Sequence, residues 1–149
     1  MPFHHLLVPT DFSDCALSAL GLAVRVAREH KASIALLHVG QSPGVALAEA
    51  GRYSAVLTPV LMTRYEDLAR AQHEATETLG REHIPAEVSW RVVQRDGFPF
   101  EEILSEAKSG DYDLIVMGTH GRTGFDRVLL GSVVERVLRG ATIPVLVTR

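Results

Sequence analysis

The fold is decided by DLIVMGTHGRTGFDRVLLGSVVERV, residues 113–137, where an apolar run passes through a glycine-containing segment into an amphipathic run. DLIVM (113–117) has the length and composition of a strand that is buried on both faces. SVVERVLRG (132–140) carries its apolar residues at helical spacing. A buried strand followed by a helix is the repeating unit of parallel sheets, so this stretch predicts an α/β protein.

The rest of the chain repeats the same alternation. Four further strands are expected at HHLLV (4–8), SIALLHV (33–39), EVSWRVV (87–93) and PVLVT (144–148). Three further helices are expected, one from an N-cap at Ser13 to His30, one opened by Thr58-Pro59 and ended by Pro85, and one at 98–110. The second of these has an apolar stripe at Leu61, Tyr65, Leu68, Gln72, Ala75 and Leu79.

These elements predict a doubly wound, five-stranded parallel sheet with helices on both faces, because strand–helix–strand crossovers are right-handed. We find neither an internal repeat nor a linker, so residues 1–149 are interpreted as a single domain. The connection at 40–57 is long and has no clear period. We expect it to form a flap or a short helix.

Composition and charge exclude several classes of protein. The chain is 46% hydrophobic and 22% charged, which is typical of a globular domain, and Cys15 is its only cysteine, which excludes an internal disulfide. Its 18 acidic and 15 basic residues give a net charge of −3 with scattered arginines, which argues against nucleic acid as the main partner. The first residues show no basic region before a long apolar stretch, and no apolar run approaches the roughly 18 residues that span a bilayer. We therefore expect a cytoplasmic protein with no membrane partner.

The glycines after Met117 predict an anion site. Ligands of doubly wound sheets bind at the carboxyl ends of the strands, where the strand order reverses. Gly118 and Gly121 permit close approach to the main chain, and Gly131-Ser132 stands where the last helix exposes unpaired N–H groups that favour phosphate. Ser132 and Glu135 also fit an S-x-x-E capping box, which explains the serine but not the glycines.

Better-known phosphate loops and catalytic motifs are missing from the sequence. No G-x-G-x-x-G follows the first strand, and no G-x-x-x-x-G-K-[ST], G-x-S-x-G or H-E-x-x-H occurs. Without a lysine to stabilise charge on a γ-phosphate, a bound nucleotide is expected to be held well and hydrolysed poorly. Of the seven histidines only His120 lies inside the glycine loop, where it either orients the loop, touches phosphate or has a structural role.

The loop Gly118-x2-Gly121-x9-Gly131-Ser132 resembles the G-x2-G-x9-G-[ST] nucleotide-binding signature of the universal stress protein family, with no departure in spacing. LLVPTDFS, LLHV, GFPFEEIL and ATIPVLVTR resemble further landmarks of that family, and the resemblance covers the chain apart from 40–57. It implies the strand order 3-2-1-4-5, with the switch point between the first and fourth strands.

The resemblance also implies a set of site residues. In ATP-binding members the aspartate of the P-T-D motif lies at the nucleoside, which implies Asp11 with Pro9 and Thr10 beside it; the alternative for Asp11 is capping of the helix after Ser13. The adenine contact is implied for Val39, with Met117 alongside. The phosphates are implied to lie on Gly118, Gly121, Gly131, Ser132 and Val133. From its place in the loop, Arg122 is either a further phosphate contact or an exposed surface arginine.

Two functional classes follow from these residues and the resemblance. In the first, ATP with Mg²⁺ or Mn²⁺ occupies the crevice and biases a surface that a protein partner reads during stress. The second is a slow ATPase, a phosphotransferase or an adenylyl-transferring enzyme of the same fold, and the missing lysine favours the first. AMP or a cyclic nucleotide would satisfy much of the same site. The short, apolar last strand predicts a homodimer, which the resemblance also implies.

Overall fold

Strands and helices alternate along the chain in the computed structural model, which describes residues 2–40, 58–120 and 130–149, with the backbone alone at 58–61. The elements are β1 (His5–Pro9), α1 (Asp14–His30), β2 (Ser33–Gly40), α3 (Thr58–His83), β3 (Trp90–Asp96), α4 (Pro99–Ser109), β4 (Leu114–Gly118), α5 (Ser132–Gly140) and β5 (Val145–Thr148). The connection for which we expected a flap or a short helix lies, from residue 41 on, outside the described residues.

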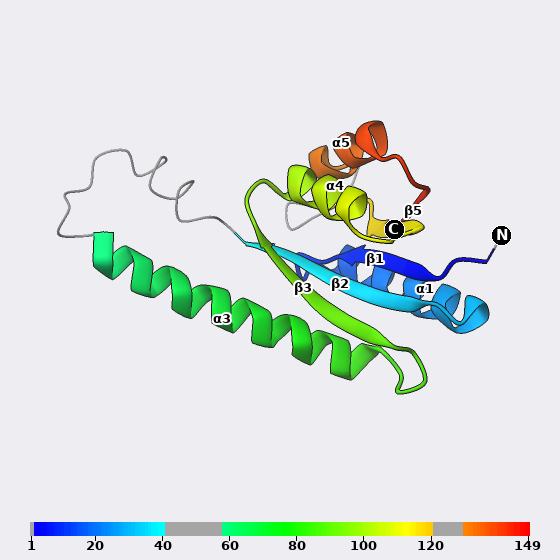
Figure 1. The fold of residues 1–149 in the computed structure, drawn as a ribbon, viewed down its shortest axis with the longest axis horizontal. Coiled ribbons are helices and arrows are strands. Elements are labelled where there is room, and N and C mark those ends of the chain that lie inside the picture. The colour runs from blue at the N-terminus through cyan, green and yellow to red at the C-terminus, as the bar shows by residue number, and fades with distance from the viewer. Residues whose placement is uncertain (1, 41–57, 121–129) are drawn as a thin grey trace.

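The five strands form one parallel sheet in the order β3-β2-β1-β4-β5. The chain begins at the centre, runs outward through β2 to β3, crosses back to β4 and ends on β5. Helices α1 and α3 cover one face of the sheet, and α4 and α5 cover the other (Figure 1). The predicted α/β, doubly wound fold and its strand order are confirmed.

Each face of the sheet has its own apolar core because successive residues of a strand point to opposite faces. Leu6 and Val8 of β1 pack toward α1, whose inner face is largely alanine, while Leu7 packs toward α4 and α5. The side chains of Leu6, Leu7 and Val8 are all fully buried. The central strand is therefore apolar on both faces, as the uninterrupted LLV of the sequence requires.

The predicted position of β3 was wrong by three residues. The strand was expected at 87–93 but occupies Trp90–Asp96. The N–H of Val88 donates to the carbonyl of Pro85 (3.0 Å), which closes a turn after α3, and Trp90 is the residue that pairs with Ile34 of β2. Val88 lies in this turn, and its side chain is buried in the core. Its apolar character therefore indicated a core position and not a strand.

The predicted apolar stripe of α3 was partly wrong. Leu68 is 53% exposed, whereas Thr76 is fully buried and Gly80 packs directly against the ring of Trp90. Figure 1 gives the reason, because α3 extends past the end of the sheet, and its first turns have no strand beneath them. Leu61 belongs to the residues whose side chains are not described.

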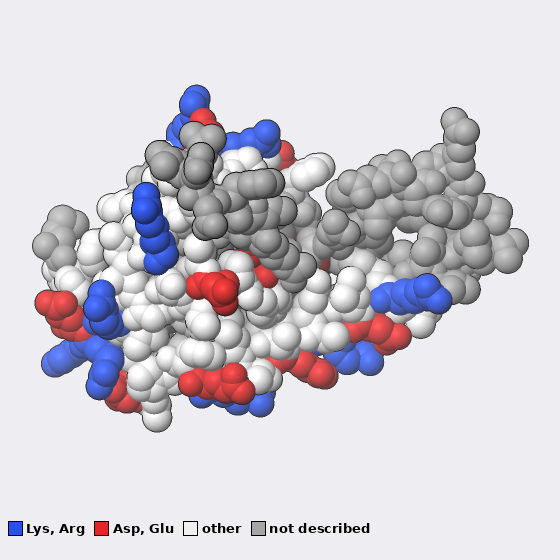
Figure 2. All heavy atoms as spheres, turned by 180° about the vertical axis from the view of Figure 1, so that it is seen from behind, with Lys and Arg blue, Asp and Glu red and all other residues white. Residues whose placement is uncertain are grey.

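Acidic and basic side chains alternate along α3 on the face seen in Figure 2, with ion pairs such as Arg70 to Asp67. Charges of both signs are therefore interspersed along this helix. Among the described residues, no helix is both long and apolar enough to cross a membrane.

Candidate functional site

The carboxyl ends of β1 and β4 lie next to each other at the point where the strand order reverses. Leu6 pairs with Leu114 and Leu7 with Ile115, so the two strands end at the same edge. The chain leaves β1 for α1 on one face and reaches α5 on the other face after β4. Because the two connections diverge, they leave a crevice above the strand ends.

The turn after β1 is held by its own side chains. Phe12 has a left-handed backbone (φ 64°), and its N–H donates to Thr10 Oγ1 (3.1 Å). Asp11 Oδ1 accepts the N–H of Ser13 (3.0 Å), and Ser13 Oγ accepts the N–H of Ala16 (3.2 Å) as the predicted N-cap of α1. Asp11 thus helps to form the start of α1 from a position at the crevice.

Gly118 is a glycine because of packing between β4 and α1. A Cβ at this position would lie 2.7 Å from the backbone C and O atoms of Cys15, in the first turn of α1. No side chain is tolerated at that distance. We expected Gly118 to permit the approach of a ligand, and the structure shows that it permits the approach of a helix.

The start of α5 differs from a capping box. Gly131 is the N-cap and Ser132 is the first helical residue, and no side chain of the described residues caps the helix. Glu135 Oε1 accepts instead from Arg139 Nη2 (2.8 Å), one turn further along. The alternative in which Ser132 and Glu135 cap the helix is therefore wrong.

The N–H of Gly131 is already bonded. It donates to the carbonyl of Thr119 (2.8 Å), which ties the start of α5 to the end of β4. The N–H groups of the first helical turn are those of Ser132, Val133 and Val134, and the described part of the chain offers them no acceptor. These three groups, rather than the N–H of Gly131, are available to an anion.

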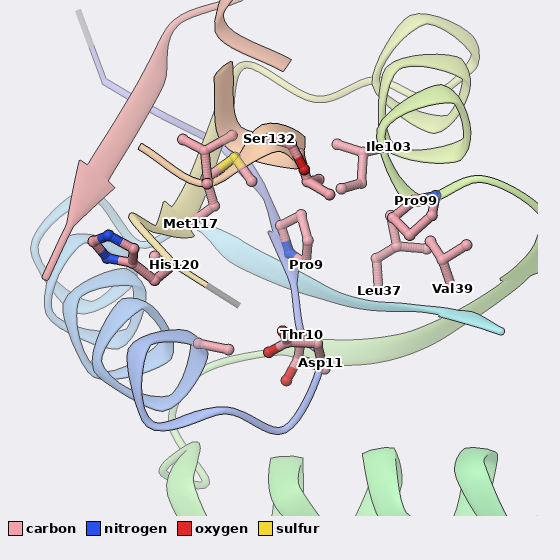
Figure 3. A pocket seen from close by; sticks show the side chains of 15 residues that line it. Pro9, Thr10, Asp11, Leu37, Val39, Pro99, Ile103, Met117, His120 and Ser132 are labelled. Carbon is pink, nitrogen blue, oxygen red and sulfur yellow. The ribbon is translucent and has the colours of Figure 1, made fainter. Parts of the chain in front are cut away.

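A pocket of ≈ 280 Å³ occupies the crevice. Leu37, Val39, Pro99 and Ile103 gather on one side of it, and Met117 and His120 lie on the other (Figure 3). Its lining residues are Pro9, Thr10, Asp11, Ala16, Leu37, Val39, Pro99, Ile103, Met117, Gly118, His120, Gly131, Ser132, Val133 and Val134. The pocket thus combines an apolar wall, one carboxylate and a helix N-terminus.

The structure brings most of the predicted site residues together at this pocket. Those that line it are Pro9, Thr10, Asp11, Val39, Met117, Gly118, Gly131, Ser132 and Val133. Gly121 and Arg122 lie outside the described residues.

Sequence reasoning missed the apolar wall. Leu37 falls in the predicted strand 33–39, and Pro99 and Ile103 fall in the predicted helix 98–110. The sequence assigned none of the three a role in the site, although all three line the pocket. The available signal was the strand's period of two, which places Leu37 on the same face as Val39. No local pattern could have brought α4 to that face, because the contact joins β2 to a helix about 60 residues away in the sequence.

His120 lines the pocket, and its Nδ1 lies 2.9 Å from Thr119 Oγ1. Its Nε2 is buried and has no hydrogen-bond partner among the described residues. The same part of the chain contains no group of three or more histidine, cysteine or carboxylate side chains that could hold a metal ion. Asp11 is the carboxylate that the described residues bring to the pocket.

Known proteins resemble this chain over nearly its whole length. The model of the universal stress protein family matches residues 2–149. Universal stress protein MJ0531 of Methanocaldococcus jannaschii is 35% identical over 148 residues, which are 99% of this chain and 82% of that protein. The solved structure of MJ0577 from the same organism has a TM-score of 0.78 at 28% identity, over 99% of this chain and 96% of that one.

Two solved structures with lower identity contain a nucleotide. One is a universal stress protein in complex with cAMP, with a TM-score of 0.62 and 21% identity over 100% of this chain and 98% of that one. The other is the universal stress protein from Archaeoglobus fulgidus in complex with dAMP, with a TM-score of 0.61 and 19% identity over 100% of both chains. Their likeness to this chain is one of fold. The family match over residues 2–149, together with the strand order, establishes that the chain belongs to the universal stress protein family.

Proposed function

We propose that this chain binds ATP in the pocket between β1 and β4 and acts as a regulatory binding module in the response to stress. The observation that carries the proposal is that one pocket joins an apolar wall to the start of α5, whose first N–H groups find no acceptor among the described residues. An adenine nucleotide has two parts that match these features. Its flat base carries little charge and suits the apolar wall, and its chain of phosphates suits the N–H groups.

The apolar wall suits the base. Leu37 and Val39 come from β2, and Pro99 and Ile103 face them from α4 (Figure 3). A wall of aliphatic side chains favours a flat ring laid against it, because burial of the ring removes apolar surface from water at about 25 cal/mol per Å².

The start of α5 suits the phosphates. The N–H groups of Ser132, Val133 and Val134 point out of the helix without a capping side chain, and the helix dipole adds positive potential at the same end. A phosphate oxygen would supply the acceptor that the described residues do not offer these groups.

Asp11 also lines the pocket and would serve the ribose or a metal ion. A carboxylate accepts hydrogen bonds from ribose hydroxyls, and Mg²⁺ or Mn²⁺ on the phosphates is usually held with one or two carboxylates and water. Asp11 is the one carboxylate that the described residues bring to the pocket, and a single carboxylate fits a metal that arrives with the nucleotide. When bound, that metal would neutralise charge on the phosphates.

The relatives add support at the level of the fold. Universal stress proteins with this fold have been solved in complex with cAMP and dAMP, both of which carry an adenine. We infer from the same resemblance that the chain forms a homodimer through β5 and works in the cytoplasm with a protein partner.

The first experiment identifies the ligand. Freshly purified protein is denatured, and the released small molecules are analysed by mass spectrometry, followed by calorimetric titration of the emptied protein with ATP, AMP and cAMP. ATP should be released and should bind most tightly. If no adenine nucleotide is released and none binds at millimolar concentration, the proposal is wrong.

A pair of variants at Asp11 separates binding from capping. Asp11→Asn keeps an oxygen that can accept the N–H of Ser13 but loses the charge, whereas Asp11→Ala loses both. We expect both variants to weaken ATP binding by more than about tenfold, or about 1.4 kcal/mol. Only Asp11→Ala should lower the melting temperature of the ligand-free protein. Normal affinity in Asp11→Asn would leave capping as the role of Asp11.

The enzymatic alternative is tested in the same preparation. A binding module returns ATP intact after incubation with Mg²⁺ or Mn²⁺, whereas a slow ATPase releases phosphate at a rate proportional to the protein concentration. Loss of that phosphate release in Asp11→Ala would move the assignment to an enzyme.

A further inference from the structure

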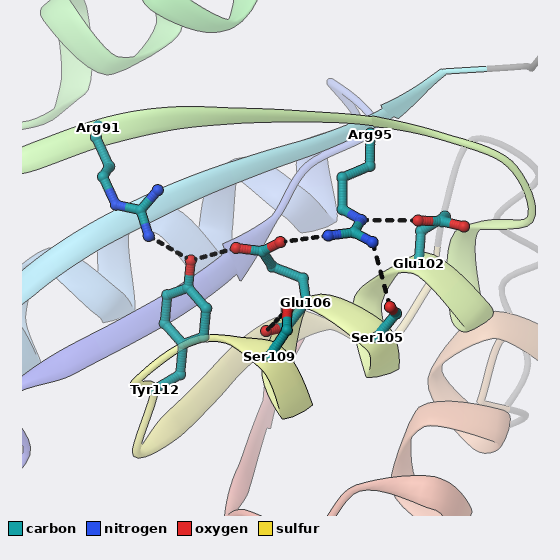
Figure 4. Close-up of polar contacts among 7 residues, drawn as sticks. All are labelled: Arg91, Arg95, Glu102, Ser105, Glu106, Ser109 and Tyr112. Atoms are coloured by element: carbon teal, nitrogen blue, oxygen red, sulfur yellow. Dashed lines mark hydrogen bonds and ion pairs between the residues drawn. The ribbon is translucent and has the colours of Figure 1, made fainter.

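Five side chains connect the edge strand β3 to helix α4. Arg95 Nε donates to Glu102 Oε2 (2.7 Å), and Arg95 Nη1 donates to Glu106 Oε2 (2.8 Å). Tyr112 Oη donates to Glu106 Oε1 (2.6 Å), and Arg91 Nη2 donates to Tyr112 Oη (2.7 Å). Figure 4 shows these residues, which we call the α4 polar cluster, as one continuous row between the strand and the helix.

The local periods of strand and helix bring these residues together. Arg91 and Arg95 are four residues apart on β3, so both point to the face that α4 covers. Glu102 and Glu106 are four residues apart on α4, one turn of helix, so both point toward β3. The neighbouring Ile103 points into the core and the pocket instead.

The cluster gives α4 a defined position. Glu106 is only 8% exposed, and both of its carboxylate oxygens are bonded. A buried carboxylate is tolerated only while its partners stay in place, so a shift of α4 along or away from β3 would leave the charge unpaired. The planar guanidinium of Arg95 restricts the helix further, because its Nε and Nη1 contact carboxylates on two successive turns.

Glu102 also fixes the turn that leads into α4. Gly97 has φ 146°, and its N–H donates to the carbonyl of Gly40 at the end of β2 (2.9 Å). The carboxylate of Glu102 packs over Gly97, where a Cβ would come within 2.9 Å of Oε1. The β3–α4 turn is therefore held on one side by β2 and on the other by the cluster.

We propose that Arg95, Glu102 and Glu106 are positioning residues of the pocket that hold Pro99 and Ile103 beside Leu37 and Val39 of β2, so that the four side chains form one apolar wall against which a purine base lies. Pro99 begins the helix directly after the held turn, and Ile103 lies between the two clustered glutamates in the sequence. The inference rests on the proposed function, because it makes the adenine end of the same pocket depend on the polar cluster between α4 and β3.

The test uses the enclosure of a bound base as its readout. Protein is saturated with 1,N6-ethenoadenosine triphosphate, and acrylamide quenching of the base fluorescence measures its exposure, while titration with ATP gives the affinity. Glu106→Leu should weaken ATP binding by about tenfold and raise the quenching constant of the bound base toward that of free nucleotide. Glu106→Gln keeps one oxygen that can accept from Arg95 and gains an amide N–H that can donate to Tyr112 Oη, so it should stay within about twofold of wild type.

Two more variants keep the result decisive. Glu101→Leu is the matched control, since Glu101 is exposed on the same helix and should change neither readout. Arg95→Lys retains the charge but cannot bond both glutamates through a fork, so it should raise quenching even if Glu106→Leu fails to fold. If wild type binds ATP and Arg95→Lys shields the base as wild type does, the cluster only stabilises the fold and the inference is overturned. If wild type binds neither nucleotide, the proposed function is wrong, and this inference, which depends on it, is wrong as well.

Discussion

At the scale of single residues, the glycines of the signature have different physical reasons. Gly118 allows α1 to pack against the end of β4. Gly131 has φ −59° and ψ 153°, a conformation open to any residue, and its N–H is bonded to Thr119. A pattern of glycines that reads as one motif therefore combines a packing requirement with a position whose backbone does not require glycine.

Gly118→Ala should destabilise the protein whether or not a ligand is present. The added Cβ would meet the backbone of Cys15 at 2.7 Å, and overpacking of this kind costs about 1–3 kcal/mol. Urea denaturation measures the change in the free energy of unfolding. Gly21→Ala is the control, because a Cβ in the middle of α1 meets nothing within 4 Å there and should add about 0.5–1 kcal/mol. Equal stability of Gly118→Ala and wild type would contradict the packing explanation.

Gly131→Val should leave the ligand-free protein folded and remove ATP binding. Its backbone suits valine and its N–H is retained, but the branched side chain would stand at the pocket beside Ser132. Glu135→Ala is the control, because Glu135 pairs only with the exposed Arg139 at this end of the described chain and should leave the affinity unchanged. Calorimetric titration gives both affinities, and normal ATP binding by Gly131→Val would remove α5 from the proposed site.

At the scale of the elements, helices α3 and α4 differ in how the sheet holds them. The first turns of α3 extend past the sheet, and its exposed Leu68 shows that an apolar period alone does not determine which face is buried. Helix α4 is short, and the polar cluster sets its position in addition to its apolar face. The position of the shorter helix is thus more closely defined.

Tyr112 should make stability fall at high pH. Burial, together with donation of its hydroxyl to Glu106, raises the pKa of Tyr112 from 10.0 to about 12. The unfolded chain loses this proton first, so the stabilisation is fully present below pH 10 and is lost as the pH rises from 10 to about 12. Urea denaturation across this range should show a smaller decline in Tyr112→Phe than in wild type. Equal declines would mean that Tyr112 ionises as freely in the folded protein as in the unfolded chain.

At the scale of the whole molecule, β5 is the edge of the sheet and explains the expected homodimer. It pairs only with β4, and all four of its residues are partly exposed. The N–H groups of Ile115 and Thr119 donate to the carbonyls of Pro144 and Thr148, so the residues in alternate positions, Val145 and Val147, direct their N–H and C=O groups away from β4. These unpaired groups could bond a second copy of the strand.

Val147→Pro should separate the dimer without breaking the sheet. Proline removes an outward N–H and is tolerated on an edge strand. Light scattering at micromolar concentration should give twice the 16.3 kDa chain mass for wild type and the single mass for Val147→Pro. Val147→Ala keeps the N–H and should remain dimeric. A monomeric wild type, or a Val147→Pro protein that is still dimeric, would contradict pairing through β5.

The sequence by itself determined the local features of this protein. The alternation of strands and helices, the N-cap at Ser13 and the extent of α5 follow from interactions within a few residues, and the resemblance supplied the strand order. The alternation, the N-cap and the extent of α5 were predicted correctly because local periodicity and capping depend on neighbouring residues only. The start of β3 was predicted too early because residues of the turn that Val88 and Pro85 close include an apolar side chain, and this apolar residue was read as part of the strand.

Only the tertiary structure decided what each residue of the crevice contacts. The close approach of Gly118 to Cys15, the bond from Gly131 to Thr119 and the apolar wall of Leu37 and Ile103 all join segments far apart in the sequence. Such contacts depend on how the helices pack on the sheet. No local sequence pattern encodes differences of a few tenths of an ångström in packing distance. The sequence therefore specified that a crevice forms, and the packing of α1, α4 and α5 decided its shape.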